Sequence, residues 1–206
     1  MIAIIDYGAG NLRSVSNAIA KLGYKSEVTS DTDDVLSADA IILPGVGAAA
    51  DTMHNLKELG MAEVIRQLIA EVRPLLAICV GMQVLFQKTE EGGWKECLGI
   101  IPGYVRRLPQ GLKVPHMGWN QVKQMVKHPI FEGIPEESNF YFVHSYYADP
   151  DDKAMIAGVS EYGVSICSML IKDNLIATQF HPERSGEYGL RIYDNFLKMA
   201  LDGRQA

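Results

Sequence analysis

The chain has 206 residues, enough for one domain with a substantial core, so we expect a single domain over residues 1–206. The formal net charge is -6 and no run of Lys or Arg offsets it, which argues against a nucleic-acid-binding surface. No apolar stretch reaches the length of a membrane span, and the N-terminal apolar run is short and lacks a basic lead, so we expect neither a signal peptide nor a membrane partner.

The first half of the chain alternates short apolar runs with amphipathic segments. Such alternation predicts parallel strands with helices on both faces of a sheet. Gly23 stands where a helix C-terminus favours glycine. The predicted strands are Ile2–Ile5, Tyr24–Val28, Ala40–Leu43 and Leu75–Cys79, and the predicted helices run from Leu12 to Leu22 and from Met61 to Glu71.

The second half changes character, because strand-like runs follow one another through short, turn-rich links. This pattern predicts a mixed or antiparallel extension of the sheet. A closing helix carries apolar residues from Leu190 to Ala200. We therefore expect a doubly wound α/β domain with its active residues at the carboxyl ends of strands. The predicted strands of this half are Ile100–Val105, Val122–Met125, Phe140–Val143, Met155–Val159, Val164–Met169 and Leu175–Phe180.

Cys79 ends an apolar strand and is followed at once by a helix-like stretch, with the small residues Ala77 and Gly81 on either side. This spacing is typical of a nucleophile elbow, in which a sharp turn exposes the reactive side chain. The N–H groups of the following helix would favour the thiolate. The alternative is a small, buried, unreactive cysteine. Cys97 and Cys167 complete a set with no disulfide or zinc spacing, which fits a reducing cytoplasm and predicts no metal.

A second candidate site is Gln179-Phe180-His181-Pro182-Glu183, at the end of another predicted strand. Side chains two residues apart in an extended segment point the same way, so His181 and Glu183 should share a face. A thiol needs a base to take its proton, and the base needs a third group to orient it. Cys79, His181 and Glu183 supply one of each, although a polar surface turn would also explain the proline.

The segment Pro44-Gly45-Val46-Gly47 follows a strand and contains two glycines that allow its backbone to approach a ligand. Acyl transfer by a cysteine needs two backbone donors for the developing oxyanion. The N–H of Val80 is one candidate, and an N–H of the Val46–Gly47 peptide is the other. A plain tight turn is the competing interpretation.

Three other segments have less specific patterns. Asp6 to Asn11 resembles a phosphate-binding loop but lacks the third glycine and the Lys-Ser/Thr end, so a loop that packs or contacts a partner is favoured. Trp119 is either a core aromatic or an interface anchor. His144 is expected to be structural, and Ser145 and Tyr146 could present backbone groups to a charged substrate.

The strings AICVGMQ around Cys79 and QFHPERSG around His181 resemble the two signatures of the class I (triad) glutamine amidotransferases. The strings DYGAGN, LPGVG, PHMGWN and YFVHSY narrow the resemblance to the glutaminase subunits of imidazole glycerol phosphate synthases in histidine biosynthesis, nearly end to end. The resemblance implies a flavodoxin-like, doubly wound fold, L-glutamine as substrate and no cofactor. It also implies a partner cyclase with a (β/α)8 barrel that receives ammonia in a heterodimer.

The resemblance implies a role for each matching residue. Cys79 would attack the glutamine amide, His181 would carry the proton to the departing ammonia, and Glu183 would orient His181. A peptide flip in the Pro44–Gly47 loop would complete the oxyanion hole when the partner is loaded. Glutamine would be bound by Gly47, Gln83, Glu91, Ser145 and Tyr146, and the cyclase would be contacted by Asn11, Trp119, Tyr141 and Arg184.

Two positions depart from the family pattern. Ala77 stands where glycine is usual, so the turn should be slightly tighter, and Arg184 stands where lysine is common. Arg has a planar donor fork, so an ion-pair geometry expected for lysine does not carry over.

Three other functions compete with this interpretation. The chain could serve another acceptor, as in anthranilate or GMP synthesis, although PHMGWN and YFVHSY count against this. It could be a non-catalytic α/β binding module with an inert cysteine. It could also be a stand-alone cysteine hydrolase or protease, which would act at full rate without a partner.

Overall fold

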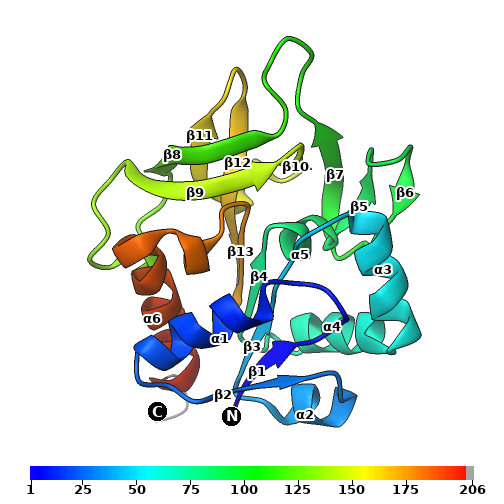
Figure 1. Ribbon diagram of the computed structural model, residues 1–206, viewed down its shortest axis with the longest axis vertical. Coiled ribbons are helices and arrows are strands. Elements are labelled where there is room, and N and C mark those ends of the chain that lie inside the picture. Colours follow the sequence, from blue (N-terminus) through cyan, green and yellow to red (C-terminus); the bar gives the residue numbers. More distant parts are fainter. Residues whose placement is uncertain (203–206) are drawn as a thin grey trace.

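A sheet of nine strands forms the centre of the computed structural model, which describes residues 1–202 (Figure 1). Its parallel part has the order β2 (Ser26–Thr29), β1 (Ile2–Ile5), β3 (Ala40–Leu43), β4 (Leu75–Ile78) and β13 (Leu175–Thr178). Antiparallel strands continue it as β12 (Ser165–Lys172), β11 (Ile156–Glu161), β8 (His116–Gln124) and β9 (Ser138–His144). The predicted fold class, a doubly wound sheet with a mixed extension, is confirmed. The predicted domain of residues 1–206 stays a prediction, and residues 203–206 lie outside the described part.

A second sheet of four strands stands beside the first. Its order is β10 (Tyr146–Pro150), β7 (Ile101–Arg107), β5 (Phe86–Thr89) and β6 (Lys95–Glu96). The strand predicted at Ile100–Val105 exists, but its expected place in the extension of the main sheet is wrong. Its neighbours in space, β5 and β10, have no clear alternation in the sequence, so nothing there indicated a separate sheet.

Helices cover both faces of the parallel strands, as the alternation predicts (Figure 1). On one face α1 (Leu12–Lys21) packs against α6 (Gly186–Asp202). On the other face α4 (Met61–Ala70) packs against α2 (Thr32–Ser37) and α3 (Ala49–Glu58). The short helix α5 (Val80–Gln83) follows β4, and the 3-10 helices are η1 (Pro129–Phe131), η2 (Lys153–Met155) and η3 (Pro182–Arg184).

Individual residues determine where the helices of the N-terminal half begin and end. Gly23 has φ +88° and ends α1 in the left-handed conformation that the sequence indicated. Sequence reasoning missed α2, although Asp31 caps it by accepting hydrogen bonds from the N–H groups of Asp33 (2.8 Å) and Asp34 (3.3 Å). The run Asp31-Thr32-Asp33-Asp34 was the available signal.

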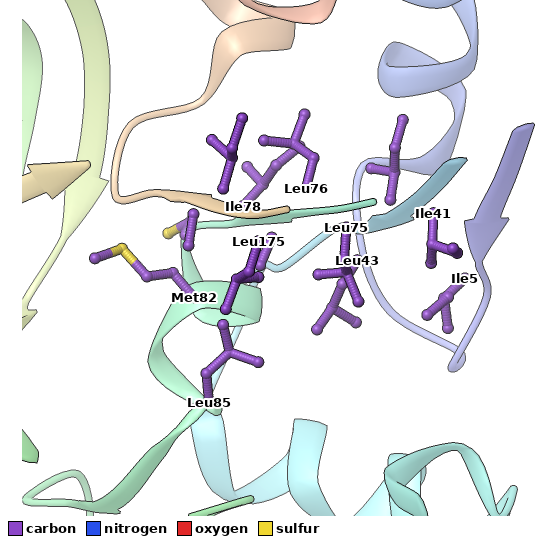
Figure 2. Packing of buried hydrophobic residues seen from close by; sticks show 14 of the residues in the cluster. Ile5, Ile41, Leu43, Leu75, Leu76, Ile78, Met82, Leu85 and Leu175 are labelled. Atoms are coloured by element: carbon purple, nitrogen blue, oxygen red, sulfur yellow. The ribbon is translucent and has the colours of Figure 1, made fainter. Parts of the chain in front are cut away.

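Every residue of β1, β3 and β4 is buried because helices cover these strands on both sides. Figure 2 shows Leu43 and Leu75 close together on one side of the parallel strands and Leu76 on the other side, and all three side chains are buried. Full burial of each such side chain contributes about 1.5–3 kcal/mol to folding. This rigid core fixes the point at which β4 ends, and therefore the position of the next residue, Cys79.

Within residues 1–202, the structure contains no helix that is both long and apolar enough to span a bilayer. In the same part of the chain, no group of three or more His, Cys, Asp and Glu side chains is arranged to hold a metal ion.

Candidate active site

Cys79 occupies the turn between β4 and α5 in a strained backbone conformation. Its φ is +52° and its ψ is -107°, values that side-chain-bearing residues rarely adopt and that cost about 1–3 kcal/mol. Its N–H is held by the carbonyl of Thr178 at 2.7 Å. This is the geometry of a nucleophile elbow. The expected helix is only four residues long, so its dipole is weaker than the sequence argument assumed.

Two glycines let the Pro44–Gly47 loop lie against this turn. A Cβ on Gly45 would meet the N atom of Gly81 at 2.1 Å, and a Cβ on Gly81 would meet the carbonyl oxygen of Leu43 at 2.5 Å. Both contacts are far shorter than van der Waals distances, so neither position accepts a side chain. The Pro44–Gly47 loop therefore lies against the turn that contains Cys79, at the carboxyl ends of β3 and β4.

His181 and Glu183 meet as the sequence predicted, although by a different local geometry. Nδ1 of His181 lies 2.8 Å from Oε1 of Glu183, and both side chains are buried. The chain is extended at His181 but turns into η3 at Pro182, so Glu183 is not on the same extended strand. The Ser185 hydroxyl donates to the carbonyl of His181 at 2.6 Å and fixes this turn.

The imidazole of His181 stands between two groups that favour its charged form. Burial alone would lower its pKa, but the Cys79 sulfur and the Glu183 carboxylate, both within hydrogen-bonding contact, raise the pKa to about 10. Because Nδ1 faces Glu183, Nε2 is left for the sulfur. A positively charged His181 beside the sulfur is the arrangement that activates a cysteine nucleophile.

A cavity of about 270 Å³ opens at this point. This volume suits a small ligand such as one amino acid, because it is below the roughly 300–1,000 Å³ of drug-sized sites. The cavity brings together the predicted nucleophile, base, oxyanion and substrate-binding residues, which come from five separate segments. Its lining includes Val46, Gly47, Cys79, Val80, Gln83, Glu91, Ser145, Tyr146 and His181. The roles predicted for these residues stay predictions.

Several lining groups already have partners within the protein. The carbonyl of Tyr146 accepts hydrogen bonds from Nε2 of Gln83 and from Nδ1 of His144, both at 2.9 Å. Oε2 of Glu91 accepts from the N–H of Ala49 at 2.6 Å. The Tyr146 carbonyl is therefore occupied, and Oε1 of Gln83 is the end of that amide left for a ligand.

The Asp6–Asn11 loop supports the Pro44–Gly47 loop. The buried hydroxyl of Tyr7 donates to the carbonyl of Pro44 at 2.9 Å. Burial raises the pKa of Tyr7 to about 12, against the opposing effect of hydrogen bonds with Thr52 and the backbone of Val46. The hydroxyl therefore stays protonated and holds the first residue of the Pro44–Gly47 loop, which agrees with the prediction that Asp6–Asn11 is a loop that packs against the protein.

Three of the predicted partner-contact residues form one exposed cluster. Trp119 and Tyr141 face each other across the β8–β9 pair, with ring centroids 6.1 Å apart. The guanidinium of Arg184 lies over the Tyr141 ring at 4.4 Å. Trp119 is 58 % exposed, so its interpretation as a core aromatic is wrong. The fourth residue, Asn11, precedes α1, a helix that packs against η3, the 3-10 helix that contains Arg184.

This exposed cluster is connected to the base. The carbonyl of Tyr141 accepts a hydrogen bond from the backbone N–H of His181 at 2.9 Å. The N–H of Tyr141 donates to the Ser185 hydroxyl at 2.9 Å. A partner that moves Tyr141 would therefore act directly on the backbone that positions His181.

Gln179 is a site residue that sequence reasoning missed. Its side chain is fully buried, and its Nε2 lies 3.6 Å from the sulfur of Cys79. The period of two along the strand end was the available signal, since Gln179 and His181 share a face while Phe180 packs on Phe140 with centroids 4.2 Å apart.

The remaining cysteines differ from Cys79. Burial raises the pKa of Cys97 to about 11 and that of Cys167 to about 12, so both stay thiols. Neither lines the cavity that contains His181. Of the three cysteines, Cys79 alone is placed for nucleophilic chemistry.

Comparison with known families gives a match over almost the whole chain. The family "Glutamine amidotransferase class-I" matches residues 3–200. Curated relatives include the "Imidazole glycerol phosphate synthase subunit HisH" of Dehalococcoides mccartyi (strain CBDB1), which is 60% identical over 205 residues with 100% of both chains covered. The protein of the same name from Herpetosiphon aurantiacus is 50% identical, with 98% of this chain and 95% of the relative covered.

Solved structures resemble the fold. The structure of PurLQS from Thermotoga maritima superposes with a TM-score of 0.76 at 18% identity and covers 96% of this chain and 97% of that chain. A second structure, described as a glutamine amidotransferase, also gives a TM-score of 0.76 at 18% identity, with coverage of 97% and 99%. At this identity the likeness concerns the fold alone.

Proposed function

Because the chain belongs to the class I glutamine amidotransferase family, we propose that it hydrolyses L-glutamine to glutamate and ammonia with Cys79, His181 and Glu183 as its catalytic triad. One observation supports this most strongly. The Cys79 sulfur and the His181 imidazole face the same cavity, and Glu183 holds the far nitrogen of His181 at 2.8 Å.

The reaction proceeds in two halves. The sulfur of Cys79 attacks the side-chain carbonyl carbon of glutamine, and His181 passes the thiol proton to the nitrogen that leaves as ammonia. The carbon–nitrogen bond breaks and a γ-glutamyl thioester forms on Cys79. Water then attacks the thioester, His181 takes its proton and returns it to the sulfur, and glutamate departs. Backbone N–H groups of Val80 and of the Val46–Gly47 peptide would stabilise the oxyanion in both halves.

The ammonia acceptor is proposed from the relatives and the surface. Relatives at 50–60% identity are named as subunits of imidazole glycerol phosphate synthase, which supports a cyclase partner with a (β/α)8 barrel over an anthranilate or GMP synthase. In that complex ammonia would give imidazole glycerol phosphate and the carboxamide ribotide, in the cytoplasm. The exposed cluster of Trp119, Tyr141 and Arg184 beside His181 is the proposed contact.

Glutamate release by the full chain, with the cyclase subunit and its nucleotide substrate present, tests the proposal. Cys79→Ala should lower turnover by more than about 1,000-fold with the fold retained, because no other residue can form the thioester. Cys97→Ala is the matched control and should keep wild-type turnover, since Cys97 lies outside the cavity. Equal turnover in both variants would support an inert cysteine, and full activity without the cyclase would support a stand-alone hydrolase.

A further inference from the structure

A continuous chain of buried and partly buried hydrogen bonds leads from the Cys79 sulfur to strand β8. Nε2 of Gln179 lies 3.6 Å from the sulfur, and Oε1 of Gln179 accepts from Nε2 of Gln83 at 3.1 Å. Nε2 of Gln83 also donates to the carbonyl of Tyr146 at 2.9 Å. That carbonyl accepts in addition from Nδ1 of His144 at 2.9 Å.

The chain continues outward through a second imidazole. Nε2 of His144 lies 2.9 Å from Nδ1 of His116. Nε2 of His116 lies 3.3 Å from Nδ2 of Asn120, which also donates to the carbonyl of Glu161 at 3.1 Å. The His116 ring is held in place by stacking on Phe142 at 4.9 Å and on Tyr162 at 4.0 Å.

The backbone atoms in this chain fix the direction of every bond. A carbonyl only accepts, so Tyr146 requires an N–H on Nδ1 of His144 and the amide nitrogen of Gln83. Nε2 of neutral His144 is then an acceptor, which requires an N–H on Nδ1 of His116. The Glu161 carbonyl independently requires the amide nitrogen of Asn120 to face His116. The donors and acceptors assigned from the Tyr146 carbonyl agree with those assigned from the Glu161 carbonyl, so each hydrogen bond of the network runs in one direction only.

Both imidazoles are suited to this role because they stay neutral. Burial lowers the pKa of His144 to about 3, and burial also lowers that of His116. A protonated His144 would present an N–H to the N–H of His116 and break the chain. At neutral pH the network therefore has one stable arrangement.

The fixed direction of these hydrogen bonds determines which end of the Gln179 amide faces the Cys79 sulfur. Gln83 uses both of its N–H groups, one on Tyr146 and one on Oε1 of Gln179, so the amide of Gln179 must turn its nitrogen toward Cys79. With the opposite orientation, a carbonyl oxygen would face the sulfur and repel a thiolate. The imidazole of His181 and the carbonyl of Val143, at 4.0 Å, also lie near the sulfur.

We propose that Gln179 is a further catalytic residue, which stabilises the Cys79 thiolate through its side-chain N–H, and that His144 and His116 are positioning residues that fix the orientation of the Gln83 and Gln179 amides. The proposal rests on the proposed function for its catalytic meaning. The hydrogen-bond chain also gives the signature motif a reason to place Gln two residues before His181: both side chains then reach the sulfur.

The test measures the alkylation rate of Cys79 by iodoacetamide as a function of pH in the complete chain, together with glutamine turnover in the complex with the cyclase. Gln179→Met removes the N–H with little change in size, and the pH at half-maximal alkylation should rise. At saturating glutamine, kcat should fall about tenfold with KM changed less than twofold, as expected for loss of one hydrogen bond to a charged group. The titratable groups around the sulfur, Tyr7, Glu91, His144 and His181, are unchanged in this variant.

A second variant separates the contact with sulfur from packing. Gln179→Glu keeps the size and the acceptor for Gln83 but places an oxygen beside the sulfur, so its alkylation profile should move at least as far as that of Gln179→Met. His144→Phe should shift the profile in the same direction by a smaller amount. This variant removes a hydrogen bond that helps to orient the amides of Gln83 and Gln179, but it leaves the side-chain N–H of Gln179 in place. Gln67→Met, an exposed position on α4, is the control and should match the wild type.

The outcomes are distinguishable from failure of the proposed function. Wild-type complex that releases no glutamate would contradict the proposed function, and the alkylation profiles would still decide the contact between Gln179 and Cys79. Gln179→Glu with a wild-type profile and wild-type kcat would overturn the inference. So would a fall in kcat for Gln179→Met with no change in the pH profile, because a purely structural role predicts that result.

Discussion

Nδ1 of His181 lies 2.8 Å from Oε1 of Glu183, with side chains that are only 3 % and 2 % exposed. This buried contact leaves Nε2 of His181 for the Cys79 sulfur and fixes the tautomer that a base requires. Glu183 itself is absent from the lining of the substrate cavity. Its effect on catalysis should therefore be separable from its effect on substrate binding.

Glu183→Gln should lower kcat by roughly 10- to 10⁴-fold and leave the KM for glutamine nearly unchanged, because the carboxylate stabilises the imidazolium and does not touch the substrate. Steady-state kinetics of glutamate release in the complex measures both constants. Glu187→Gln is the matched control, since Glu187 is exposed on the first turn of α6. An unchanged kcat in Glu183→Gln would exclude Glu183 as the orienting group.

The strained backbone at Cys79 predicts an unusual ranking of stabilities. Cys79→Gly should be more stable than Cys79→Ala by about 1 kcal/mol, because glycine adopts positive φ without the strain of a side chain and this gain exceeds its entropy cost. Urea unfolding of the two variants measures the difference. If the alanine variant is the more stable, the turn is not strained in solution.

Neutral, buried His144 predicts a pH dependence of stability. The pKa of His144 is lowered to about 3 in the folded chain, against about 6.5 when unfolded, so the unfolded chain binds the proton first as the pH falls. The free energy of unfolding should therefore decrease between about pH 6.5 and pH 3 by an amount on the order of several kcal/mol from this group. Above about pH 6.5, His144 should not make the free energy of unfolding depend on pH.

Comparison with His144→Gln isolates this contribution from the carboxylates, which titrate in the same range. The variant should show a shallower loss of stability between pH 6.5 and pH 4 in denaturant titrations at several pH values. Parallel curves for the two proteins would mean that His144 is protonated in the fold, which the hydrogen-bond chain through Tyr146 and His116 does not allow.

Two exposed tryptophans offer a matched test of the proposed cyclase surface. Trp119 on β8 is 58 % exposed, and Trp94 beside the second sheet is 53 % exposed. Trp119→Ala should weaken the affinity for the cyclase by about tenfold or more, as expected for an aromatic anchor. Trp94→Ala, whose ring packs on Tyr104, should bind normally. Calorimetric titration with the cyclase measures both, and the reverse ranking would move the interface to the second sheet.

The parts of the site that lie next to strong local signals could be predicted from the sequence. The apolar run before Cys79 and the small residues around it indicated the elbow, and the Gln-Phe-His-Pro-Glu string indicated the base. An extended segment predicts that His181 and Glu183 share a face, whereas in the structure the turn of η3 brings the two side chains together. Proline permits both conformations, so the sequence alone did not distinguish them.

Features that depend on distant partners could not be predicted. The second sheet joins β5, β7 and β10. Strands β7 and β10 pair although β8 and β9 lie between them in the chain, and such pairing has no counterpart in local periodicity. The exposure of Trp119 depends on what covers β8, and the sequence gives only its preference for burial. The contacts of Gln179 with Cys79 and Gln83 join residues that are far apart in the sequence, so only its place two residues before His181 indicated that it belongs to the site.

The most direct test of the account is the site of covalent labelling by a glutamine-analogue diazoketone, mapped by peptide mass spectrometry with and without the cyclase subunit. We expect one adduct, on Cys79, that free glutamine suppresses and that Cys79→Ala and His181→Asn abolish or slow strongly. Labelling at Cys97 or Cys167, or labelling of Cys79 that glutamine does not suppress, would contradict a thiol activated by His181 in a glutamine-binding cavity.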